Sequence, residues 1–267
     1  SDWVYEEEYG FTRAYAFSND GSKIAYLRFD ESAVPTFEMM RFDDKLYNKA
    51  YSFKYPKAGD CNPVVELWLY DIASGTKSKL NVGSNSDQYI FNLCWTPAGE
   101  MYFYRVNRLQ NSFEVVLVRA DGTQKIIYSE SSPCYVERPS NSTVTFIDDN
   151  RFIVREETTT GWMHLYLHSV AKGRLNAITS GCWEVVSFVG HDGKNIYYTS
   201  TESSPLERNL YSVRLNGKSR RLLTPEGGFN TIIPSAGMKY YVRTFNDANT
   251  PNIITVNRAD GTTIDTL

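Results

Sequence analysis

The stretch NLYSVRLNGKSRRLLT (Asn209–Thr224) contains the pattern that decides the fold. Its first half alternates apolar and polar side chains, which is typical of a strand with one buried face. Asn216 and Gly217 then supply a tight turn, because Asn-Gly accepts the positive φ values that two-residue hairpin turns require. A second short run follows the turn. The stretch therefore predicts a β-hairpin.

The same strand, glycine turn and second strand occur five times along the chain, and helical periodicity is almost absent. A repeat at a period of about 45 residues indicates a solenoid, propeller or array. The turn glycines are spaced by 44 to 51 residues: Gly75, Gly122, Gly173, Gly217 and Gly261. The hairpins are predicted at 67–80, 114–128, 164–179, 209–224 and 252–267.

Each predicted hairpin is preceded by another hairpin with its own turn, at 18–21, 96–99, 148–150, 191–193 and 235–237. Two hairpins per repeat give four strands, which is the content of a β-propeller blade. A sandwich would place about seven to nine strands in ~100 residues without such a period. The sequence predicts an all-β fold: a partial β-propeller of about five four-stranded antiparallel blades that forms one fragment over 1–267.

The first blade is interrupted between Asp30 and Asn62. This insertion is too rich in Phe, Tyr and Met for a flexible linker, which is typically polar and rich in Gly and Ser. We expect a projecting hairpin arm over about 30–62 that packs against another surface.

Composition excludes two classes of partner. A net charge of −3 and a pI near 5.7 argue against nucleic acid, which requires clustered Lys and Arg. No apolar run approaches the ~20 residues of a membrane span. The chain opens on Ser1-Asp2-Trp3 without a signal peptide, so we expect a piece of a longer protein.

The run DWVYEEE (Asp2–Glu8) places three successive carboxylates beside two aromatic residues. Like charges repel and resist burial without a cation, so the run predicts neither a good strand nor a good core helix. One interpretation is a solvated acidic turn. The other is an anionic cup for a ligand's ammonium group, which has three donors that two carboxylates can accept.

The amino-acid sequence of several stretches resembles that of the dipeptidyl peptidase IV family of serine exopeptidases, and the stretches occur in the same order along the chain. Beyond the acidic run, they are FDESAVP (29–35), YPKAGDCNP (55–63), TSGCWEV (179–185) and RNLY (208–211). The resemblance implies the second half of an eight-bladed propeller, with blades before Ser1 and a hydrolase domain after Leu267. It also implies an exported protein, periplasmic or on the cell surface, whose arm makes subunit contacts in a homo-oligomer.

The resemblance further implies that Glu7 and Glu8 hold the protonated α-amine of a peptide substrate, so that N-terminal dipeptides are released. Glu6 and Tyr5 are expected to support them. Glu137 and Arg138 fall where the family extends its pocket. The implied partners are peptides with a free N-terminus and the hydrolase domain of the same parent chain.

Catalytic and metal chemistry are not predicted for this chain. It lacks the Gly-x-Ser-x-Gly elbow of a serine hydrolase, so we expect it to be inactive alone. His164, His168 and His191 are expected at the surface or at strand edges. Cys94 and Cys182 are expected to be small buried residues. For Cys61 and Cys134 the sequence makes no prediction. Asp148-Asp149 is expected in a plain turn, and we expect no metal or cofactor.

Two alternatives stay open beside the substrate-binding propeller. One is a stand-alone propeller that serves as a protein-interaction scaffold. The other is a different peptidase of the same superfamily, of acylaminoacyl or prolyl-tripeptidyl type. The paired glutamates argue against the acylaminoacyl type, because a blocked amine carries no charge. The residue preference at the scissile bond is not set by this sequence.

Overall fold

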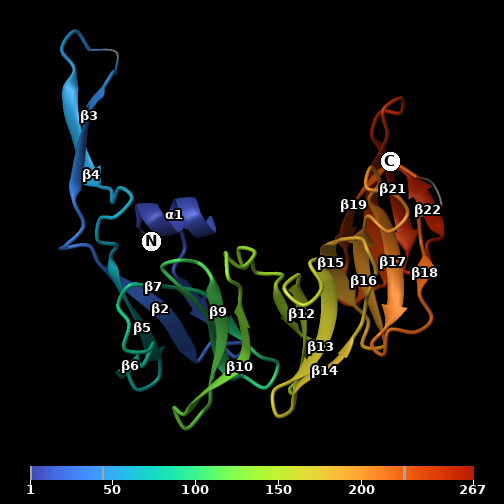
Figure 1. The fold of residues 1–267 in the computed structure, drawn as a ribbon, viewed down its shortest axis with the longest axis horizontal. Coiled ribbons are helices and arrows are strands. Elements are labelled where there is room, and N and C mark those ends of the chain that lie inside the picture. The colour runs from blue at the N-terminus through green and yellow to red at the C-terminus, as the bar shows by residue number, and fades with distance from the viewer. Residues whose placement is uncertain (1, 44, 225–226) are drawn as a thin grey trace. The chain divides into compact units, whose positions relative to one another are not determined.

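A computed structural model describes residues 2–43, 45–224 and 227–267 (Figure 1). The chain forms two compact units, Ser1–Ser140 and Asn141–Leu267. Four residues of the predicted fragment lie outside the described residues: Ser1, Asp44 in the arm, Pro225 and Glu226.

The first unit contains one helix, two four-stranded antiparallel sheets and a two-stranded ribbon. The helix is α1 (Trp3–Tyr9). One sheet has the order β1-β2-β5-β6, with β1 (Tyr15–Phe17), β2 (Lys23–Asp30), β5 (Val64–Asp71) and β6 (Lys77–Leu80). The other has the order β10-β9-β8-β7, with β7 (Gln88–Trp95), β8 (Met101–Asn107), β9 (Ser112–Val118) and β10 (Gln124–Ser131).

The second unit contains three four-stranded antiparallel sheets, each formed by consecutive strands. The first holds β11 (Val144–Phe146), β12 (Arg151–Glu156), β13 (His164–Ser169) and β14 (Gly173–Ala177). The second holds β15 (Val185–His191), β16 (Asn195–Ser200), β17 (Asn209–Arg214) and β18 (Arg221–Leu222). The third holds β19 (Phe229–Pro234), β20 (Tyr240–Asn246), β21 (Ile253–Arg258) and β22 (Thr263–Thr266), with a 3-10 turn at Ala236–Met238.

The five predicted four-stranded units are therefore confirmed. Gly217 lies between β17 and β18 with a φ of 76°, as its place in the turn predicts, but Asn216 does not have a positive φ, so the turn is not the two-residue Asn-Gly type. In the second unit the middle strands supply the core, because their inward side chains alternate along each strand. That core includes Ile153, Leu165, Leu167, Ile196 and Tyr198 from the middle strands, together with Val185 from the edge strand β15.

The predicted arm is also present, and Figure 1 shows it as a ribbon that leads away from the sheets of the first unit. It pairs β3 (Thr36–Arg41) with β4 (Lys49–Lys54). At its base Tyr55 packs on Trp3 of α1, with ring centroids 4.2 Å apart. Towards its end Phe42, Leu46 and Tyr47 are more than four-fifths exposed.

The prediction for two of the histidines was wrong. His164 and His168 lie in β13 and are buried, because the middle strands of these sheets carry side chains into the core on both faces. The His164 ring lies 3.0 Å from both the Thr179 hydroxyl and the Gly181 carbonyl. Burial lowers the pKa of His168 to about 4, with a smaller effect from Arg174. Both rings therefore serve packing.

Candidate functional site

The acidic run forms a helix, which corrects the expectation that it is unsuited to one. Asp2 caps α1 by accepting a hydrogen bond from the Tyr5 N–H at 3.3 Å. Gly10 ends α1 in the left-handed conformation, with a φ of 66°, and its N–H donates to the Glu6 carbonyl. Both are ordinary helix signals that outweigh the repulsion between exposed carboxylates. Burial raises the pKa of the Asp2 carboxyl.

Tyr5 fixes α1 to the first unit. Its side chain is 1% exposed and lies among aromatic rings, the nearest being Phe29 at 5.1 Å. The Tyr5 hydroxyl accepts a hydrogen bond from the Ile90 N–H at 3.0 Å and lies 3.4 Å from the Gln88 carbonyl. Tyr5 therefore anchors α1 to the first unit.

The aromatic rings beneath α1 form a floor of Tyr5, Tyr9, Phe29, Tyr89 and Phe91. Tyr9 contributes to this aromatic floor from the last turn of α1. Its ring stacks on Phe91 with centroids 4.0 Å apart and lies 5.2 Å from the ring of Tyr89. Burial raises the pKa of the Tyr9 hydroxyl, and the nearby Glu8 adds to that effect. A rigid apolar surface therefore sits directly beside the acidic residues.

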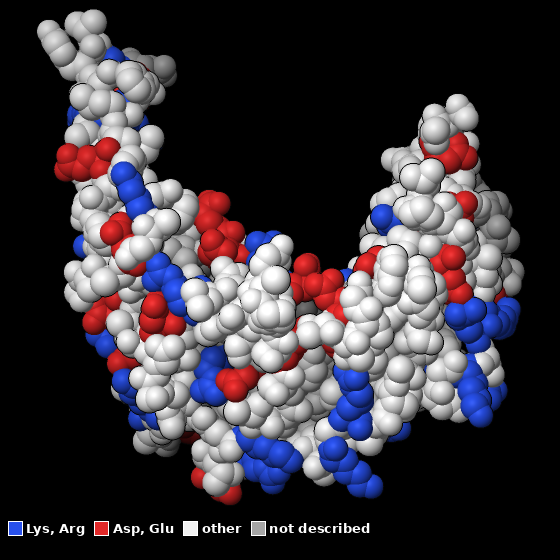
Figure 2. Space-filling model, in the orientation of Figure 1, with Lys and Arg blue, Asp and Glu red and all other residues white. Residues whose placement is uncertain are grey.

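The three glutamates occupy the outer part of α1. Glu6 and Glu7 are exposed and Glu8 is half-buried. Figure 2 shows acidic side chains gathered at the surface where α1 lies. Glu7 makes no hydrogen bond or ion pair with any residue that the structure describes. Its carboxylate is open to solvent, as binding a ligand would require.

Glu8 is held by two residues far away in the sequence. The Gln110 side-chain amide donates a hydrogen bond to the Glu8 carboxylate at 3.2 Å. The Arg138 guanidinium donates to the Glu8 backbone carbonyl at 2.8 Å. The structure thus brings Glu8 and the predicted Arg138 together. Glu137 is exposed and contacts neither of them through a hydrogen bond among the described residues.

Gln110 was missed because nothing near it in the sequence marks a site. Its place beside Glu8 results from the sheet that brings residues 102 positions apart into contact. Arg138 was found only through the resemblance. Spacing and composition alone would have found neither residue.

Glu7 and Glu8 lie at the negative end of the helix. Carboxylates in the last helical turn are disfavoured by ~0.3–1 kcal/mol, because the helix dipole places partial negative charge there. The last turn of α1 contains no basic residue of its own. The Arg138 guanidinium offsets part of this charge at the Glu8 carbonyl. A cation that bound both carboxylates would relieve more of it.

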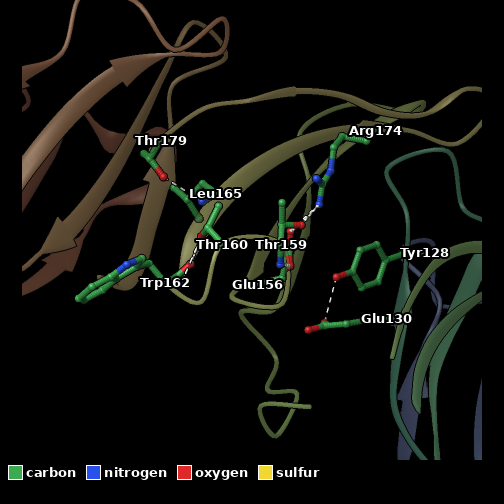
Figure 3. Close-up of polar contacts among 9 residues, drawn as sticks. All are labelled: Tyr128, Glu130, Glu156, Thr159, Thr160, Trp162, Leu165, Arg174 and Thr179. Carbon is green, nitrogen blue, oxygen red and sulfur yellow. Dashed lines mark hydrogen bonds and ion pairs between the residues drawn. The ribbon is translucent and has the colours of Figure 1, made fainter. Parts of the chain in front are cut away.

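A second polar cluster lies in the second unit, but its groups are satisfied (Figure 3). Glu156 is 3% exposed and forms an ion pair with Arg174. It also accepts hydrogen bonds from the N–H and the hydroxyl of Thr159. The Arg174 guanidinium in turn stacks 4.1 Å above the Tyr166 ring. A buried carboxylate with this many partners ties β12 to β14 and has little capacity left for a ligand.

The cysteines and the possible metal ligands were also located in the described residues. Within 2–43, 45–224 and 227–267, no group of three or more His, Cys, Asp or Glu side chains could hold a metal ion. Asp148 lies in a plain turn, as predicted, where it pairs with Arg151 at 2.7 Å.

The four cysteines are free; Cys94 is half-buried, and burial raises the pKa of its thiol. Cys182 is exposed, so its predicted burial was wrong, because it lies in the loop between β14 and β15.

No helix in the described part of the chain has the length and apolar character needed to cross a membrane.

Comparison with known proteins gives a consistent result for nearly the whole chain. The family model of the dipeptidyl peptidase IV N-terminal region matches residues 1–252. A probable dipeptidyl peptidase 4 of Arthroderma benhamiae is 32% identical over 270 residues, covering 94% of this chain and 34% of that protein. Dipeptidyl peptidase 4 of Trichophyton rubrum gives the same identity and coverage. The chain spans about a third of the length of these curated relatives.

Solved structures agree with this. The crystal structure of Porphyromonas gingivalis dipeptidyl peptidase 4 superposes with a TM-score of 0.93 at 34% identity, covering 100% of this chain and 38% of that one. A putative dipeptidyl aminopeptidase IV of Bacteroides ovatus superposes with a TM-score of 0.84 at 24% identity, covering 99% and 41%. The second likeness shows the fold alone. Together with the five four-stranded sheets, these matches confirm the predicted propeller fold.

Proposed function

Because the chain belongs to the dipeptidyl peptidase IV family, as its N-terminal region, we propose that it binds the free amino terminus of peptide substrates. Glu7 and Glu8 accept hydrogen bonds from the substrate's α-ammonium. A hydrolase domain elsewhere in the longer protein then cleaves the second peptide bond and releases a dipeptide. The length of peptide between the ammonium and the nucleophile sets the size of the product.

The observation that carries this proposal is that one carboxylate of the pair is held by hydrogen bonds and the other is open to solvent. Glu8 is fixed by Gln110 and Arg138, whereas Glu7 is exposed. The helix that carries both packs on aromatic rings through Tyr5 and Tyr9, and the Tyr9 ring stacks on Phe91. An ammonium ion is compact and has three donors, so it can bridge two carboxylates of this kind.

The proposal predicts that the longer protein distinguishes a free amine from a blocked one. A dipeptide with a chromogenic leaving group should be cleaved at least roughly 100-fold more efficiently than its N-acetylated form, because the acetylated substrate leaves two charged acceptors without a partner. Steady-state kinetics on the pair measures this ratio, and mass spectrometry of a longer peptide identifies the product. Equal turnover of the two substrates, or release of single residues, would contradict the proposal.

The arm supports a second part of the proposal, which is self-association. Met40, Phe42, Leu46 and Tyr47 are each more than half exposed near its end. Large exposed apolar patches are characteristic of protein interaction sites. A second copy of the chain would remove them from water. This pattern favours homo-oligomer formation through the end of the arm, where Phe42, Leu46 and Tyr47 lie between β3 and β4.

We expect the double change Phe42→Ser and Tyr47→Ser to weaken self-association by roughly tenfold or more, because it removes two large apolar contacts. Sedimentation equilibrium over a wide concentration range measures the dissociation constant. Leu206→Ser is the matched control, since Leu206 is 86% exposed in the other unit. If the unmodified chain stays monomeric at high concentration, or both variants behave alike, the arm is not the contact surface.

A further inference from the structure

Gln110 has an unusual backbone conformation for its residue type. It ends a turn after β8, where its N–H donates to the Asn107 carbonyl at 2.9 Å. Its φ of 53° lies in the left-handed region, which costs a residue with a side chain roughly 1 kcal/mol. Glycine adopts this conformation at no such cost. A strained residue of this kind is a reason to ask what its side chain does.

The Gln110 side chain and backbone connect three segments around Glu8. Its amide donates to the Glu8 carboxylate at 3.2 Å. Its carbonyl accepts a hydrogen bond from the Val136 N–H at 2.9 Å. Val136 lies two residues before Arg138, whose guanidinium donates to the Glu8 carbonyl. The carboxylate and the backbone of Glu8 are thus fixed from the same side of the first unit.

The chemistry of an amide donor suits this position. A carboxylate has two oxygens with about four acceptor sites, and one hydrogen bond from Gln110 occupies only one of them. Because the amide is neutral, this hydrogen bond adds no positive charge beside the Glu8 carboxylate. A Lys or Arg at the same place would neutralise that charge and compete with a bound ammonium. Gln110 can therefore orient the carboxylate without weakening its attraction for a cation.

We propose that Gln110 is a positioning residue that orients the Glu8 carboxylate toward the substrate's ammonium, which rests on the function proposed above. It does not touch the substrate. Its contribution is to reduce the rotational freedom that Glu8 would otherwise lose on binding.

The test uses Gln110→Gly in the full-length protein, measured with the free-amine and N-acetylated substrates. This change removes the donor but relieves the backbone strain, so its melting temperature should equal or exceed that of the unmodified protein. We expect KM for the free-amine substrate to rise roughly 3- to 30-fold with kcat little changed, because one hydrogen bond to a charged group is lost. The acetylated substrate should show no change. Gln110→Met, which keeps the length of the side chain and the strained backbone, should raise KM for the free-amine substrate in the same way.

Leu109→Ala is the control, because Leu109 is 73% exposed in the same turn. A further variant combines Gln110→Gly with Glu8→Gln, and the added loss should be less than about twofold if the two residues act together. If both Gln110 variants keep normal selectivity while Glu8→Gln loses it, the positioning role is wrong and the proposed function stands. If the unmodified protein does not prefer a free amine, the proposed function fails and the role of Gln110 fails with it.

Discussion

Replacing Glu7 or Glu8 with Gln in the full-length protein should lower kcat/KM for a free-amine dipeptide substrate by roughly 10- to 150-fold. The change removes a charge but keeps the size of the side chain. A hydrogen bond to a charged group is worth ~1.5–3 kcal/mol when it is partly shielded from water, and this range sets the expected loss. Steady-state kinetics on purified variants measures it directly.

The two sites are expected to differ in how they respond. Glu8 is held by Gln110, so Glu8→Gln places two amides side by side and also disturbs that contact. Glu7 is exposed, and Glu7→Gln changes only the charge available to the substrate. Glu6→Gln is the matched control on the same helix and should lower kcat/KM less than about threefold. Unchanged turnover in both the Glu7 and Glu8 variants would mean that the acids form only a solvated surface.

Changing Tyr5 to Ala should produce the largest loss of stability, about 3–5 kcal/mol, because it removes a large buried aromatic ring. Tyr5→Phe should cost about 1–3 kcal/mol, since it leaves the buried Ile90 N–H without its acceptor. Hydrogen exchange followed by mass spectrometry measures both, because it reports on peptides of the first unit separately from those of the second.

The control for Tyr5 is Tyr135→Ala, since Tyr135 is 71% exposed in the same unit and its loss should change stability by less than about 0.5 kcal/mol. Both Tyr5 variants should also lower amine selectivity, because they release the helix that carries Glu7 and Glu8. A fully protected first unit in Tyr5→Ala would show that the aromatic floor does not hold α1.

The sheets could be predicted from the sequence because their signals are local. Alternation along a strand and a turn such as Asn216-Gly217 depend on neighbouring residues, and the repeat spacing links one hairpin to the next. The arm was predicted from composition, because the insertion at 30–62 is too rich in Phe, Tyr and Met for a flexible linker. The burial of His164 could not be predicted from the sequence. A strand covered on both faces of its sheet and a strand covered on one face differ in what packs against the other face, which local sequence does not reveal.

The candidate site was only partly predictable. Glu7 and Glu8 were identified by resemblance, and their charge suits the ammonium binding that we propose for them. The helix that carries them was missed, because repulsion between carboxylates was weighted above the cap signals of Asp2 and Gly10. Gln110 could not be found from the sequence, since its contact with Glu8 depends on the tertiary fold.

The length of α1 has a consequence for how the site comes into being. A helix of seven residues is well below the ~12–15 residues at which an isolated helix becomes marginally stable in water. Its nucleation must therefore be supported by β7, through the hydrogen bond between Tyr5 and Ile90, and by the turn that carries Gln110. These contacts bridge more than 80 residues of chain, so their formation requires closure of a long loop, which costs entropy. A nascent or partly unfolded chain would present its carboxylates without the arrangement on which the proposed ammonium binding depends, so that binding would require a folded first unit.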